Sequence, residues 1–150
     1  MNRWYARLFE SKNTDERLVD DYYAFFTCCF HLKDWLKADA ALNPKIGEAA
    51  ESLVNRDPWL RLCADVANGA KHLVVSRTPR VDPTARLERG EVLVAPPNAP
   101  EKGERLDAVM LHADGKLAIA IMVAADCLRE WNNFLAAWGL VVKSSEGVTP

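Results

Sequence analysis

Four side chains of different chemistry recur at helical spacing between residues 61 and 72. At about 100° per residue, they fall within about 60° of one another on a helix. A histidine can act as general acid or base, an arginine can hold a phosphate, and an aspartate or asparagine can orient either group. The stripe indicates either a functional site or the solvent-facing side of an amphipathic helix; its members are Arg61, Asp65, Asn68 and His72.

The dipeptide Asn68-Gly69 is an unfavourable choice inside this helix. Relative to two alanines it costs about 1 to 1.5 kcal/mol of helix stability. Glycine allows another backbone to approach closely, and an asparagine side chain can donate and accept hydrogen bonds at once. We therefore expect a close contact at this point, with Lys71 adding positive charge beside the stripe.

A second polar line, made of Thr27, His31 and Asp34, interrupts an otherwise apolar helix. Buried polar groups need hydrogen-bond partners. If this line faces the first stripe, Asp34 or Asp65 can orient His31 or His72 by accepting an imidazole N–H. The alternative is an internal hydrogen-bond network that only fixes the register of the helices.

Capping residues predict where the helices of the first half begin. Asn13 can cap a long helix that runs to about Leu42 and is apolar almost all round, as expected of a central, buried helix. Asn43-Pro44 and Asp57-Pro58 each combine a cap with a first-turn proline, and so open a short second helix and a third helix over 59–75. Residues 14–75 are thus predicted to form a three-helix bundle.

The second half is predicted to be mostly loop and sheet, closed by one helix. Prolines prevent a helix over 76–103, where 91–95 is the expected strand. Residues 104–123 read as a β-hairpin, because Asp114-Gly115 supplies the positive φ values of a tight turn. Asp126 is expected to cap a helix over 126–139 that stops at Gly139. The predicted class is α+β, mainly α, with a three-helix bundle, a small antiparallel sheet and a C-terminal helix.

Composition is that of one ordinary globular domain over residues 1–150. A net charge of -2 gives no global attraction to nucleic acid, so any such contact must be local. No apolar run reaches the roughly 18 residues that a bilayer requires, and the start lacks a signal peptide's apolar core. We therefore expect a cytoplasmic protein without membrane contact.

The four cysteines lie in expected helices among apolar neighbours, which predicts reduced core thiols. A zinc site would require Cys28, His31, Cys63 and His72 to converge, and no paired Cys-x-x-Cys spacing supports it. Phosphate-binding glycine loops and the common hydrolase motifs are also absent from the sequence. We expect neither a metal nor a cofactor.

The aromatic first helix ending in His31-Leu32-Lys33-Asp34-Trp35, followed by the helix with Asn68-Gly69-Ala70-Lys71-His72, resembles the HEPN-like helical domains of prokaryotic toxin and phage-defence systems. It is also similar to bacterial proteins that share the Asn-Gly-x-Lys-His run. The resemblance covers about residues 14–75. It implies a metal-independent ribonuclease site, usually built across a dimer, in which the catalytic histidine corresponds to His72.

The family's catalytic arginine has no counterpart at the expected spacing. Asp65, Val66 and Ala67 occupy those positions, and ten residues separate Arg61 from His72. Ribonuclease chemistry needs an acid or base near the 2′-hydroxyl and a cation near the phosphate. The chain supplies both only if folding or dimerisation brings Arg61 or Lys71 to the histidine, which argues against an enzyme.

Further arginines follow the third helix and offer phosphate contacts beside His72, among them Arg77 and Arg80. Glu88 and Glu91 dilute this charge, so a solvated loop of mixed charge is the alternative.

Two functions remain open. The first is a HEPN-like protein that binds or cleaves RNA as a dimer, with His72 and Arg61 catalytic, Lys71, Arg77 and Arg80 on phosphate, and Asp65, Asn68, His31 and Asp34 orienting. The second is a non-catalytic module that binds a protein partner.

Overall fold

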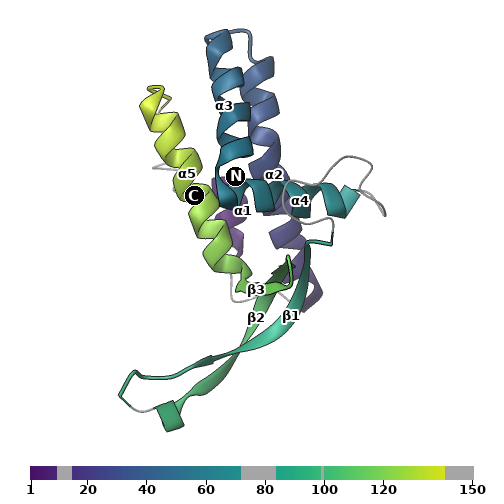
Figure 1. Ribbon diagram of the computed structural model, residues 1–150, viewed down its shortest axis with the longest axis vertical. Helices are drawn as coiled ribbons and strands as arrows, with labels where there is room; N and C mark the ends of the chain where they lie inside the picture. The colour runs from purple at the N-terminus through teal and green to yellow at the C-terminus, as the bar shows by residue number, and fades with distance from the viewer. Residues whose placement is uncertain (10–14, 72–83, 99, 141–150) are drawn as a thin grey trace, which may run out of the picture.

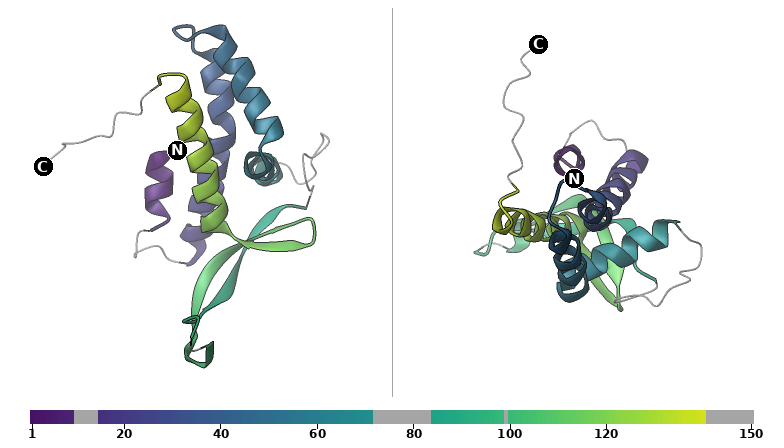
Figure 2. Two further views of the ribbon diagram at one scale, coloured as in Figure 1. Left: turned by 60° about the vertical axis from the view of Figure 1, so that its left-hand side comes forward. Right: turned by 90° about the horizontal axis from the view of Figure 1, so that it is seen from above.

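Long helices build the body of the molecule, and a twisted sheet extends from one end of it (Figure 1). The computed structural model describes residues 1–9, 15–71, 84–98 and 100–140. The helices α2 (Asp15–Ala38) and α3 (Pro44–Arg56) form a neighbouring pair, and α5 (Ala120–Ala137) lies beside them (Figure 2). The remaining long helix, α4 (Pro58–Lys71), crosses near the sheet.

A short helix that the sequence did not predict, α1 (Asn2–Arg7), packs on α2. Arg7 Nη2 lies 3.1 Å from Oδ1 of Asp21, a carboxylate that is only 4% exposed. The guanidinium stabilises this buried charge, which would otherwise be costly to remove from water. The ion pair thereby ties the start of the chain to the central helix.

The starts of α3 and α4 confirm the predicted caps. The Asn43 side chain accepts a hydrogen bond from the Lys45 N–H at 3.0 Å, and Pro44 is the first helical residue. Asp57 Oδ1 accepts from the backbone N–H groups of Trp59 and Leu60 at 3.0 and 2.9 Å. In both cases the side chain satisfies N–H groups that have no partner within the helix.

The predicted end of the first long helix was wrong by a turn. α2 ends at Ala38 rather than near Leu42, because the Asp39 carboxylate accepts a hydrogen bond from the Ala41 N–H at 2.9 Å. Such a local side-chain bond competes with the helical hydrogen-bond pattern. The expected cap Asn13, and the predicted extension of the third helix past Lys71, lie outside the described residues.

The sheet has the antiparallel order β1-β2-β3. Its strands are β1 (Arg86–Val94), β2 (Glu104–Ala113) and β3 (Lys116–Ile119), with the short helix η1 (Pro100–Lys102) before β2. The predicted turn is confirmed, since Asp114 and Gly115 have φ values of 51° and 65°. The strand was expected over 91–95, but β1 begins earlier, at Arg86, and is paired with β2 from there. The sequence did not show this first half of β1, because its residues are mostly polar and lack the apolar pattern of a strand. The α+β, mainly helical class is confirmed.

The last helix begins earlier than predicted. The hairpin was expected to continue through residue 123, but β3 ends at Ile119 and α5 starts at Ala120. The helical spacing of fully buried Ala120, Val123 and Cys127 explains the difference, because it forms one continuous core-facing side. Asp126 is therefore not the cap and instead pairs with Arg129 at 2.6 Å. Gly139, with φ of 69°, follows the helix as predicted.

The outer half of the β1–β2 pair projects from the body as an arm (Figures 1 and 2). At its base, Leu87, Val109 and Leu111 are buried in the core. Further out, Leu93, Val94 and Leu106 are between 47% and 66% exposed. Among the described residues, no helix is long and apolar enough to cross a membrane.

Candidate functional site

The polar stripe on α4 is not a solvated helix face. Asp65 is 3% exposed, and Arg61 and Asn68 are half-buried. A carboxylate at this depth needs partners, so the stripe belongs to the packing of the molecule. The expected general acid or base His72 lies outside the described residues, as do Arg77, Arg80 and the side chain of Lys71.

A backbone passes close to Gly69, as the sequence predicted. A Cβ atom added at Gly69 would lie 3.4 Å from the carbonyl oxygen of Ala85, just before β1. That distance is an ordinary van der Waals contact rather than a clash. Glycine therefore leaves a small space here that a methyl group can fill.

We expect Gly69→Ala to raise the free energy of unfolding by about 0.5 to 1 kcal/mol, because alanine is the better helix former. Urea denaturation of the variant and the parent chain measures the difference. A loss of stability instead would show that the Ala85 carbonyl cannot accept the added methyl group.

The second polar line forms a small charge cluster. His31 Nδ1 lies 2.8 Å from Oδ2 of Asp34, and Lys33 Nζ lies 2.6 Å from the other oxygen of that carboxylate. Lys33 also reaches Glu51 on α3 at 3.3 Å. The structure thus brings together His31 and its expected orienting carboxylate Asp34, and this cluster ties α2 to α3.

Burial disfavours the Asp34 carboxylate, but the hydrogen bonds and charges of Lys33 and His31 outweigh it and lower its pKa below the usual 3.8. The resulting stabilisation is full above that value and is lost as the pH falls through the lower folded-state pKa. We expect Asp34→Asn to flatten the acid limb of the stability curve, measured by urea denaturation from about pH 6 to about pH 2. An unchanged limb would contradict a stabilising role for this cluster.

A cavity of about 470 Å³ opens between the start of α4 and the β2–β3 hairpin. Apolar side chains from both elements form most of its wall, with Trp59 and Leu117 partly exposed. Three charged residues also line it, namely Arg61, Lys116 and Asp114. Sequence reasoning found Arg61 but missed Trp59 and Lys116, because only the docking of the hairpin on α4 brings them together. We call this cavity the α4–hairpin pocket.

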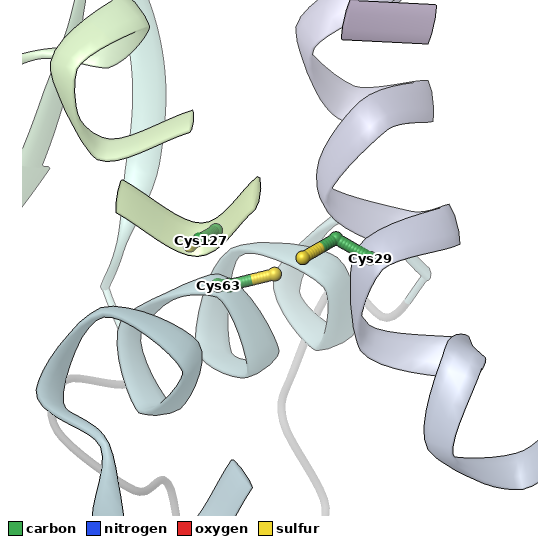
Figure 3. Close-up of side chains that lie close together, drawn as sticks. All are labelled: Cys29, Cys63 and Cys127. Carbon is green, nitrogen blue, oxygen red and sulfur yellow. The ribbon is translucent and has the colours of Figure 1, made fainter. Parts of the chain in front are cut away.

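Three of the four cysteines meet in the core (Figure 3). Cys29 of α2, Cys63 of α4 and Cys127 of α5 are fully buried, and their Sγ atoms all lie within 4.8 Å of one another. Cys28, which the rejected zinc combination included, is not a member of this group. We call these three residues the thiol cluster.

Burial opposes ionisation of every thiol in the cluster. For Cys63 and Cys127 it raises the pKa well above the usual value, whereas S–H donors from Cys127 and Cys63 outweigh it and lower the pKa of Cys29. Each of these two thiols has only one proton, and each also has a backbone carbonyl that can accept it. The Phe26 carbonyl lies 3.2 Å from Cys63 Sγ, and the Trp59 carbonyl lies 3.4 Å from Cys127 Sγ. A thiolate at Cys29 is favoured only when these two protons point to its sulfur rather than to the carbonyls.

Comparison of the chain with protein-family models, with curated proteins and with solved structures gives no match.

Proposed function

We propose that this chain is a HEPN-like protein that binds single-stranded RNA, with the α4–hairpin pocket as its nucleotide contact. The observation that carries the proposal is the pairing of an aromatic ring, Trp59, with the cations Arg61 and Lys116 around one cavity. Aromatic rings stack on bases, and arginine and lysine contact phosphates. The volume also falls within the range of small-molecule pockets, about 300 to 1,000 Å³.

Binding rather than cleavage is the activity that this geometry favours. Arg61 and Lys71 are ten residues apart on α4, which places their backbones about 15 Å apart along the helix axis. That separation exceeds the size of one phosphate group. Arg61 and Lys71 therefore serve different nucleotides, unless a second copy of the chain completes a catalytic site.

Fluorescence anisotropy with a labelled oligouridine, at low and at physiological salt, tests the proposal. Trp59→Ala should weaken binding about 5- to 150-fold, the usual range for the loss of one stacked base. Trp35→Ala is the matched control, because Trp35 is an exposed tryptophan of α2 that does not line the pocket. Equal affinities of the two variants, or no binding by the parent chain, would overturn the proposal.

The cations have their own readout. Lys116→Gln should make the dependence of log affinity on log salt concentration shallower by about 0.7 per lost phosphate contact. Lys102→Gln, a change of the same kind at an exposed site outside the pocket, should leave the slope unchanged.

Incubation of total RNA with parent protein and His72→Ala in chelator then asks whether any cleavage exists. Identical RNA profiles would leave a binding protein without ribonuclease activity.

A second candidate function, self-association, is favoured by one face of the arm. Gly90, Val92, Ala108 and Leu106 form two cross-strand pairs on that face and carry no charge. The opposite face bears the ion pairs Arg105–Glu91 and Arg89–Asp107. These four residues form an uncharged strip, with Glu88 and Glu104 at its two ends on the same face. We propose that this strip contacts the same strip of a second copy, because it is self-complementary about a twofold axis.

Sedimentation equilibrium distinguishes this arrangement from a monomer. Leu106→Lys places a charge within the uncharged strip and should shift the chain toward monomer. Leu93→Lys, on the opposite face and more exposed, should leave the association constant unchanged. A parent chain that stays monomeric at all concentrations would exclude the second candidate.

A further inference from the structure

The thiol cluster has the composition of a soft-metal site. Its three sulfur atoms come from α2, α4 and α5, and each residue is fully buried. Thiolate ligands select soft ions such as Cu(I), whereas carboxylate and carbonyl oxygens suit Mg²⁺ and Ca²⁺. The residues therefore define the class of ion that could be held.

The spacing of the sulfur atoms suits a single ion among them. Metal–sulfur bonds of about 2.3 Å in a trigonal arrangement would place the sulfur atoms about 4.0 Å apart. The present separations are within 4.8 Å. Closing them requires side-chain movements on the order of half an ångström, which rotation about the Cα–Cβ bonds supplies.

An unpartnered hydrogen-bond donor beside the cluster is an independent observation. Trp131 is fully buried, and its Nε1 has no hydrogen-bond partner among the described residues. The same N–H is one of the groups that lower the pKa of Cys29, so it lies near that sulfur, although it makes no hydrogen bond of normal geometry with it. A buried N–H without an acceptor is destabilising, and a metal-bound thiolate would supply the acceptor.

We propose that Cys29, Cys63 and Cys127 bind one Cu(I) ion, with the Trp131 N–H donating to the sulfur of Cys29. Copper is preferred to zinc because a structural zinc ion takes four ligands, and the described part of the chain offers three at this point. Copper stays Cu(I) throughout. Copper–sulfur bonds replace S–H bonds, and the released protons go to solvent. Three thiolates around Cu(I) would give the buried site a net charge of -2, whereas two thiolates and one thiol give -1. Because burial disfavours net charge, we expect two protons to leave rather than three.

The test is a competition titration of the reduced 150-residue chain with a coloured Cu(I) chelator, without oxygen. Because the site is buried, the chain is refolded in the presence of the Cu(I)–chelator complex. We expect one equivalent of copper per chain, release of two protons per ion in weakly buffered solution, and copper–sulfur scattering in X-ray absorption.

Matched variants separate the cluster from nonspecific thiol binding. Cys63→Ala and Cys127→Ala should each weaken copper binding at least 100-fold, whereas Cys28→Ala, which removes the neighbouring half-buried thiol, should not change it. Trp131→Phe keeps an aromatic ring but removes the N–H, and should weaken binding about 10- to 100-fold. Parent-like binding by Cys63→Ala or Cys127→Ala would overturn the proposal.

A measurement on the parent chain alone provides a test that does not depend on whether any variant folds. Free Cu(I) at 100 times its dissociation constant should raise the ratio of folded to unfolded protein about 100-fold, visible as a higher Tm. An unchanged Tm with no copper retained would leave the cysteines as core thiols only. Retention of Zn(II) but not Cu(I), or a disulfide within the cluster after anaerobic purification, would also overturn the proposal.

Discussion

Trp131→Ala should lower the free energy of unfolding by about 3 to 5 kcal/mol, the usual cost of truncating a fully buried aromatic residue. Trp131 has no exposed surface, and its ring packs edge to face on Phe134 with the centroids 5.6 Å apart. Alanine would leave a cavity where α5 meets the rest of the core. Urea or guanidinium denaturation, followed by far-UV circular dichroism, measures the loss.

Trp138→Ala is the matched control, because this tryptophan lies at the end of the same helix and is 36% exposed. Its truncation should cost far less than that of Trp131. Trp131→Phe should also cost much less than alanine, since it keeps most of the ring volume and removes the unpartnered N–H. Equal costs for Trp131→Ala and Trp138→Ala would contradict the placement of α5 in the core.

Gly47→Ala should destabilise the chain by about 1 to 3 kcal/mol, although alanine is the better helix former. An added Cβ at Gly47 would lie 2.8 Å from the Cα and 2.9 Å from the Cβ of Lys37. The first of these is a backbone atom, so α2 and α3 would have to move apart. Thermal and urea denaturation report the change.

The comparison with Gly69→Ala makes this prediction specific. Both variants replace glycine by alanine inside a helix, so their helix propensities change alike. Only Gly47 faces a backbone that leaves no room, and the two variants should therefore differ in sign. A stabilising Gly47→Ala would show that α2 and α3 pack less closely than the structure has them.

Local signals predicted the parts of the fold that depend on neighbouring residues. Asn43-Pro44 and Asp57-Pro58 set the starts of α3 and α4, and Asp114-Gly115 set the hairpin turn, because each acts within a few residues. The β3–α5 boundary is different. The apolar run over 120–123 suits either a strand or a buried helix, and only packing against the other helices decides between them.

The candidate sites depended still more on tertiary structure. Cys29, Cys63 and Cys127 are separated by dozens of residues, so no spacing rule could join them, and the one zinc combination considered included Cys28 instead. Trp59 was missed, because the opposite wall of its pocket comes from the hairpin, more than 50 residues further along the chain. Asp65 was correctly placed on one helical face, but periodicity alone could not tell that this face is buried.

One hydrogen bond connects the two proposed sites. The thiol of Cys127 donates to the carbonyl of Trp59 at 3.4 Å, and Trp59 also lines the α4–hairpin pocket. If Cys127 loses that proton to solvent as its sulfur binds copper, the carbonyl loses its donor and the first turn of α4 is free to readjust. Copper and RNA would then be thermodynamically linked, so that each changes the affinity of the other by the same factor. An RNA-binding protein built in this way would respond to the supply of soft metal in the cell.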